Sequence, residues 1–253
     1  MVKKIKKKLF NILINHPRLF DVINNFRKQF KKPSEEQVFL KEVFYNLKAP
    51  IKLIQIGAND GLRSDPVREY ILKYNCNVIL IEADPINFSS LKKNYKHVNR
   101  NIKFLNRGVV HKEDESVSFY SFSEQGRKII SKEKQVQIAR KASFDRAKFE
   151  NHLKELGYTD AHALVSKQNI ETISLNELFQ NEFIPDIIFT DTEGLDWALI
   201  NSIDFSSFKP KVIFFESKFN PKNTSKEAVF KKLKNAGYVI HEFQFNCCCV
   251  LKN

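Results

Sequence analysis

The chain has 253 residues, of which 42% are hydrophobic, and its formal net charge at pH 7 is +13. This length and apolar content are enough for one large domain or two small ones with a sizeable core. Residues 1–32 contain ten Lys or Arg and a single acid, Asp21, so +9 of the charge lies at one end of the chain. Because the basic character is local, the composition disfavours nucleic acid as a partner of the whole chain.

The apolar runs and the cysteines indicate the compartment. No run approaches the roughly 20 residues of a membrane span, and the N-terminal run LFNILI is shorter than the apolar core of a secretory signal, about 7 to 15 residues. The cysteines are Cys76 and the run 247–249, without zinc-site spacing. Adjacent cysteines on a strand point to opposite faces, which favours buried thiols of a reducing compartment. We therefore expect a cytoplasmic protein.

Residues 1–48 are predicted to form a basic helical extension, and residues 49–253 the main domain. Two short amphipathic helices are expected within residues 1–32, one on each side of Pro17. This arm either packs on the domain with its cationic face in solvent or makes a peripheral contact with a membrane surface or another anionic partner. Ser34 is expected to cap a further helix in EEQVFLKEVFYNL.

From residue 51 onwards, strand-like apolar runs alternate with helical stretches, which indicates an α/β fold with a parallel sheet buried on both faces. The runs IKLIQI, NVILIEA and IKFLNRGVV come first, and a crossover helix is expected to begin at Asp65-Pro66. A half-buried strand is expected at 115–123, followed by a mostly helical insertion at about 124–168. Strands at 185–191 and 210–217 and a terminal β-hairpin complete the domain.

The stretch QIGANDG places Gly57 and Gly61 in a turn directly after the first strand. The turn lacks the glycine patterns of a P-loop and of a dinucleotide site, but it lets a ligand approach the backbone at the carboxyl end of the strand. Glu82 ends the next strand, where an acid can accept hydrogen bonds from both ribose hydroxyls. The pair indicates a nucleoside site; alternatively, Glu82 is a helix-capping acid, although Asp84 can fill that role.

Asp191 and Glu193 follow a later strand in IIFTDTEGLDW, and Glu216 ends the strand after it. Neighbouring carboxylates at the edge of a sheet are candidates for a general base or a cation site. They can equally be capping or surface acids. No spacing demands a metal, and none is predicted.

Several segments occur in the order and spacing of the FkbM-like S-adenosylmethionine-dependent methyltransferases, which the chain resembles over about residues 50–251 outside the insertion. They are QIGANDG, IEADP, NRGVV, IETISLNEL, DIIFTDTEGLDWALI and VIFFES. The resemblance implies a Rossmann-like, seven-stranded, mostly parallel sheet with a C-terminal antiparallel hairpin and helices on both faces. It also implies S-adenosylmethionine as the cofactor, and methyl transfer to a hydroxyl of a sugar, a glycan or a secondary metabolite.

By this resemblance, residues 57–61 (Gly57, Ala58, Asn59, Asp60 and Gly61) form the turn under the methionine portion of the cofactor. Glu82 binds the ribose hydroxyls, Asp84 is assigned to the same site, and Val109 and Val110 run past the adenine. Asp191 and Glu193 lie beside the transferred methyl group as the catalytic pair. Gln55 stands where many class I methyltransferases have an acid, so the contact to the cofactor ammonium passes to Asp60 or Asp191.

Two other functions remain open. One is an RNA methyltransferase anchored by the basic N-terminal arm, and the other is a non-catalytic nucleoside-binding protein of the same fold. The insertion is a candidate lid or acceptor platform. The insertion contains the cations Arg127, Lys128, Arg140, Lys141 and Arg146. They either bind an anionic sugar or a lipid-linked phosphate, or are simply solvated.

Overall fold

The computed structural model describes residues 15–111, 118–218 and 225–252. A seven-stranded sheet lies at the centre, in the order β10-β11-β9-β8-β1-β2-β3. Its strands are β1 (Ile51–Ile56), β2 (Cys76–Ile81), β3 (Asn101–Leu105), β8 (Ile187–Thr190), β9 (Val212–Glu216), β10 (Tyr238–Glu242) and β11 (Asn246–Leu251). Pairing is parallel from β3 to β9, whereas β11 is antiparallel to both neighbours. The predicted sheet with its terminal hairpin is confirmed.

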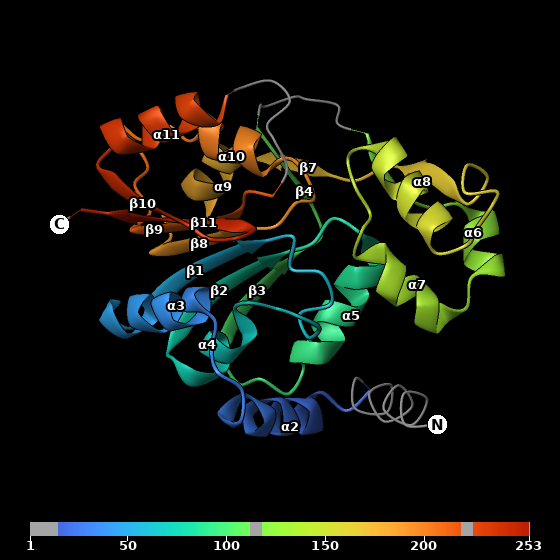
Figure 1. The fold of residues 1–253 in the computed structure, drawn as a ribbon, viewed down its shortest axis with the longest axis horizontal. Helices are drawn as coiled ribbons and strands as arrows, with labels where there is room; N and C mark the ends of the chain where they lie inside the picture. Colours follow the sequence, from blue (N-terminus) through green and yellow to red (C-terminus); the bar gives the residue numbers. More distant parts are fainter. Residues whose placement is uncertain (1–14, 112–117, 219–224, 253) are drawn as a thin grey trace.

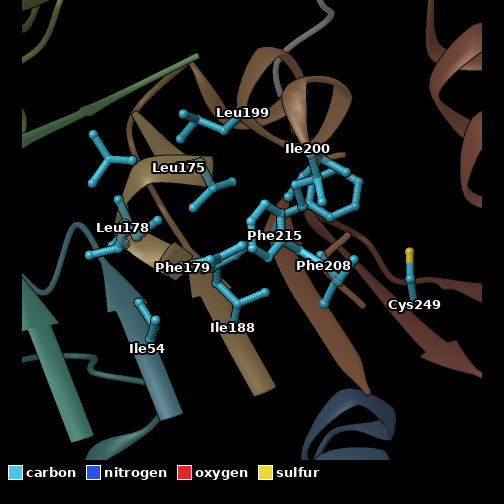
Figure 2. Close-up of a cluster of buried hydrophobic side chains, with 14 of the residues drawn as sticks. Ile54, Leu175, Leu178, Phe179, Ile188, Leu199, Ile200, Phe208, Phe215 and Cys249 are labelled. Atoms are coloured by element: carbon cyan, nitrogen blue, oxygen red, sulfur yellow. The ribbon is translucent and has the colours of Figure 1, made fainter. Parts of the chain in front are cut away.

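Helices cover both faces of the sheet (Figure 1). One face packs against α3 (Glu35–Asn46), α4 (Arg68–Lys73) and α5 (Pro85–Tyr95), and the other against α9 (Leu175–Asn181), α10 (Asp196–Ser202) and α11 (Lys226–Asn235). Figure 2 shows Ile54 of β1 and Ile188 of β8 among side chains of α9 and α10. This two-sided burial explains why the parallel strands are almost continuously apolar.

The cysteine run follows the alternation of a strand. Cys247 and Cys249 are buried in the core on the side of α9 to α11, whereas Cys248 is buried in the core on the other side. These cysteines and Cys76 are free thiols. Burial raises the pKa of Cys76 to about 11, so this thiol stays protonated and unreactive at neutral pH.

Two predicted boundaries are wrong. The run 102–110 is not one strand, because the Asn106 side chain donates hydrogen bonds to the carbonyls of Glu82 and Ala83 at 2.8 and 3.1 Å and takes the chain out of the main sheet. β4 (Gly108–Val110) instead pairs with β7 (Thr172–Ser174). Helix α4 begins at Arg68 rather than at Asp65-Pro66, because the Asp65 carboxylate accepts the backbone N–H groups of residues 67 and 68.

The segment between β5 (Phe119–Phe122) and β6 (Val165–Gln168) contains α6 (Glu124–Ile129), α7 (Lys132–Ala139) and α8 (Arg146–Glu155). Residues 115–117 of the strand predicted at 115–123 lie outside the described residues. Phe122, Phe149 and Leu153 form part of a separate hydrophobic core within this segment. Its three helices lie beyond the carboxyl ends of the central strands (Figure 1). The division of the chain into extension, domain and insertion stays a prediction.

Helix α2 (Pro17–Gln29) is joined to the domain by a buried ion pair. The Arg68 guanidinium donates to both carboxylate oxygens of Asp21, at 2.7 and 2.9 Å. It also donates to the carbonyls of Gly61 and Asn94, at 2.9 and 3.1 Å, and lies 4.5 Å from the Tyr95 ring centroid. One side chain therefore joins α2, the turn after β1 and the end of α5. The helix predicted before Pro17 falls mostly on residues 1–14, outside the described residues.

We expect Arg68→Leu to lower the free energy of unfolding by about 3 to 5 kcal/mol, because it leaves a buried carboxylate and two carbonyls without their donor. Urea unfolding measures this change. The matched control is Lys103→Gln, which breaks the exposed pair between Lys103 and Glu182 and is expected to cost less than about 1 kcal/mol. Equal losses in the two variants would contradict the role given to Arg68.

Candidate active site

A narrow pocket with a cavity volume of about 40 Å³ lies at the carboxyl ends of β1, β2 and β8 and beside the start of β4. The main domain supplies Ile56, Gly57, Asn59, Glu82, Ala83, Arg107, Gly108, Val109, Asp191, Thr192 and Glu193, and residues 119–144 supply Phe119, Ala139, Arg140, Ala142 and Phe144. The turn, the acid after β2 and the acids after β8 are thus brought to one cavity.

The turn after β1 depends on glycine at its first position. Gly57 has φ +77°, and a Cβ atom there would lie 2.0 Å from the backbone oxygen of Asp191. Any side chain would therefore push β1 and β8 apart at their carboxyl ends. Asn59 follows at φ +50°, a left-handed conformation that Asn tolerates better than most residues. Its backbone N–H points to Glu82.

Glu82 is a buried carboxylate that holds two loops together. One oxygen accepts the backbone N–H of Asn59 and the other accepts the backbone N–H of Asp84, each at 2.8 Å. Burial and the neighbouring Asp84 carboxylate raise the pKa of Glu82 to about 8. When the group is ionised it has about four acceptor positions, so each oxygen then keeps one for a ligand.

Five residues of the predicted cofactor site are not among the described residues that line the pocket. They are Ala58, Asp60, Gly61, Asp84 and Val110. Asp60 accepts the backbone N–H groups of Leu62 and Arg63, both at 3.0 Å. Asp84 caps α5 through the N–H groups of residues 86 and 87 and accepts the Ser121 hydroxyl. Asp60 and Asp84 thus shape the loops around the pocket, and their assignment to the cofactor stays a prediction.

Asp191 follows β8 and its carboxylate is open to the pocket. Surrounding protein and the charges of Asp196 and Glu193 raise its pKa to about 6, although Lys141 and Arg140 act in the opposite direction. A carboxylate with this pKa is ionised at neutral pH but is more basic than an ordinary aspartate. It is therefore suited to accept a proton from a ligand.

Glu193 differs from Asp191 because two lysines of the insertion bind it. Lys141 pairs with one carboxylate oxygen and the Lys148 Nζ lies 3.0 Å from the other. Burial alone would raise the pKa of Glu193, but the hydrogen bond and charge of Lys141, together with the charge of Lys148, hold it below its usual value. Glu193 has φ +56°. The predicted catalytic pair thus separates into an open carboxylate and one that is already paired.

Glu216 ends β9 beside Asp191, as expected for neighbouring strands. One of its oxygens is buried without a hydrogen-bond partner. Burial and the charges of Asp191, Glu193 and Asp196 raise the pKa of Glu216 to about 8. Within residues 15–111, 118–218 and 225–252, no group of three or more His, Cys, Asp or Glu side chains is arranged to hold a metal ion.

Sequence reasoning missed much of the pocket wall. Phe119 and Phe144, in edge-to-face contact with ring centroids 5.2 Å apart, line it together with Arg107. Of the insertion cations named above, Arg140 lines the pocket and Lys141 binds Glu193, whereas Arg146 pairs with Glu150 at 2.6 Å. No spacing in the sequence links these residues to the strand ends.

Comparisons with solved structures reveal distant similarity. A precorrin-6y C5,15-methyltransferase from Geobacter metallireducens is 12% identical, with 89% of this chain and 92% of that chain covered and a TM-score of 0.44. A methyltransferase FkbM from Methylobacillus flagellatus is 14% identical, with 81% and 45% covered and a TM-score of 0.43. Fibrillarin from Aeropyrum pernix, solved with bound S-adenosyl-L-methionine, is 9% identical, with 80% and 66% covered and a TM-score of 0.38.

A search of the curated proteins found no match. The family comparison is more direct: residues 55–240 match the model of the methyltransferase FkbM domain. This range begins at the end of β1 and runs into β10, so it includes every strand end that contributes to the pocket. The chain belongs to the FkbM methyltransferase family.

Proposed function

We propose that the protein transfers a methyl group from S-adenosylmethionine to a hydroxyl oxygen of a sugar, a glycan or a secondary metabolite. Family membership supports the reaction class. The observation that supports these assignments most directly is the single pocket lined by both Glu82 and Asp191, at the carboxyl ends of β2 and β8. One acid is placed for a nucleoside and the other for an acceptor.

The residues around Glu82 fit a ribose. Each carboxyl oxygen already accepts one backbone N–H, and in the ionised group each keeps one acceptor position, so the two oxygens can accept two adjacent hydroxyls. Gly57 presents bare backbone to the same pocket, where any side chain would clash with β8. Val109 and Phe119 offer apolar surface for a flat ring nearby.

S-adenosylmethionine supplies a methyl group made electrophilic by its sulfonium. The protein must then hold the acceptor hydroxyl in line with that methyl, and such positioning can contribute about 7 to 11 kcal/mol. Asp191 is the acid open to the pocket and accepts the hydroxyl proton, which adds about 100- to 10,000-fold in rate. Glu193, paired with Lys141 and Lys148, positions the insertion over the pocket.

We expect Glu82→Gln to weaken the binding of S-adenosylhomocysteine by about tenfold to a hundredfold, because an amide NH₂ replaces one of the two oxygens that accept the ribose hydroxyls. Isothermal titration calorimetry measures the affinity. The 2′-deoxy analogue should bind the wild type more weakly than S-adenosylhomocysteine does, and the variant should bind the two ligands almost equally. Glu182→Gln, on the surface, is the matched control. Unchanged affinity in Glu82→Gln would contradict the ribose contact.

We expect Asp191→Asn to lower the turnover by about 100- to 10,000-fold with little change in cofactor affinity. The assay transfers tritiated methyl groups from S-adenosylmethionine to a cell extract that contains glycans, metabolites and RNA. In the wild type at saturating S-adenosylmethionine and limiting extract, the labelling rate should fall about tenfold per pH unit below pH 6, because Asp191 accepts a proton only when ionised. The variant should lose this dependence.

The chemistry of the labelled product separates the possible acceptors in this assay. A methyl ether on a hydroxyl resists mild base, whereas a methyl ester on a carboxylate is hydrolysed. Label that is released by base, or that is found in the RNA fraction, would overturn the proposed acceptor while leaving methyl transfer intact. Failure to bind S-adenosylhomocysteine at all would overturn the whole proposal and favour another role for the fold.

We expect Glu216→Gln to stabilise the ligand-free protein increasingly as the pH rises from about 4.5 to 8, with no further gain above pH 8. In this range the unfolded Glu216 is ionised, but the folded one stays protonated because its pKa is about 8. The free energy of unfolding of the wild type therefore falls as the pH rises through this range, whereas the neutral glutamine side chain of the variant adds no such pH dependence. Thermal unfolding from pH 5 to 9 measures the difference, and each kcal/mol corresponds to about 2 to 4 °C. A pH-independent difference would contradict this titration.

A further inference from the structure

Helix α2 presents an apolar stripe to solvent. Leu19, Val22, Phe26 and Phe30 recur at intervals of three and four residues, so they lie on one face of the helix and its C-terminal end. Their exposed fractions are 47%, 65%, 60% and 74%. The rings of Phe26 and Phe30 contact each other with centroids 5.0 Å apart. A continuous exposed stripe of this kind marks an interaction surface.

The domain fixes the direction in which this stripe faces. Asp21 is bound by the buried Arg68 and lies 3.3 Å from the His97 ring, and Lys28 pairs with Glu69 of α4. These contacts belong to the inward face of α2 and turn the apolar residues away from the domain. In Figure 1 α2 lies at the outer edge of the molecule, beyond α4 and α5.

Cations surround the stripe at both ends. Near Leu19, one surface hollow is lined by Arg18, by Lys93 of α5 and by Lys96 directly after α5. Near Phe26 and Phe30, a second hollow is lined by Arg27, Lys28, Lys31, Lys32 and Lys41. In the sequence, five more lysines precede residue 10. Apolar side chains ringed by Lys and Arg match the composition of helices that lie in the headgroup region of anionic membranes.

We propose that α2 docks the protein on the surface of a bilayer that contains anionic lipids. A helix of 13 residues is about 20 Å long, and it would lie in the membrane plane with Phe26 and Phe30 at the boundary between headgroups and acyl chains. Among the described helices, none is long and apolar enough to cross a membrane. The proposed contact is with the membrane surface, and it does not depend on the methyl transfer proposed above.

The charges favour a bilayer over two other occupants. In a symmetric dimer the same face meets itself, so the cations at the two ends of one stripe would approach those of the other copy and repel them. Nucleic acid would satisfy the cations through phosphate contacts but would leave Leu19 and Val22 in water. An anionic bilayer satisfies both the cations and the apolar side chains.

The test compares full-length proteins by flotation with vesicles of phosphatidylcholine alone and of phosphatidylcholine mixed with phosphatidylglycerol. We expect the wild type to bind the mixed vesicles, and binding to fall steeply at about 0.5 M salt. Phe26→Ser/Phe30→Ser should weaken binding at least about tenfold, because two rings that would be buried in the bilayer are lost. Arg27→Gln/Lys31→Gln/Lys32→Gln should weaken it to a similar degree and flatten the salt dependence.

Ile129→Ser is the matched control, because Ile129 of α6 is 59% exposed but lies in the insertion. It should bind vesicles as the wild type does. All variants keep residues 1–14, so a loss of binding is attributable to the substituted side chains. Three results would overturn the proposal: unchanged binding in the double Phe variant, an equal loss in Ile129→Ser, and a dimer in vesicle-free size-exclusion chromatography that the double Phe variant abolishes.

Discussion

The close approach of β1 and β8 at their carboxyl ends is the constraint on which the site depends. Backbone meets backbone there, because Gly57 has no Cβ to hold the carbonyl of Asp191 away. The same left-handed turn directs the N–H of Asn59 to Glu82, which also accepts the N–H of Asp84 in its own loop after β2. The carboxyl ends of β1, β2 and β8 are thus held around one pocket mainly by contacts to the backbone. Such contacts lose less conformational entropy on folding than contacts between long side chains do.

The sequence predicted the parts of the site that follow from strand periodicity. Gly57, Glu82 and Asp191 each directly follow a short apolar run, and parallel strands bring their carboxyl ends to one edge. The cores on the two faces were predictable for the same reason, down to the opposite orientations of Cys247 and Cys248. The number of strands and the terminal antiparallel hairpin came with the family resemblance, and the sheet confirms both.

What the sequence did not predict depends on how distant segments fold back. Lys141 and Phe144 lie in a charged helical stretch, and nothing in its spacing indicates that they reach the edge of the sheet. Asp84 illustrates a competition between roles, since an acid before Pro85 suits both a helix cap and a ligand contact. In the ligand-free protein the cap and Ser121 occupy its carboxylate. Asn106 ends a strand through a side-chain hydrogen bond that no hydrophobic pattern encodes.

The ion pair between Arg68 and Asp21 has a geometric consequence. From the sequence alone, the N-terminal arm could be a flexible linker, whose reach would be set by its length. The shared guanidinium instead makes α2 part of the same rigid unit as the turn after β1. The separation between the outer face of α2 and the pocket is therefore a fixed dimension of the molecule. A membrane bound by α2 would then lie at one fixed distance and orientation from the pocket. Acceptors would be selected by their distance from that membrane as well as by their chemistry.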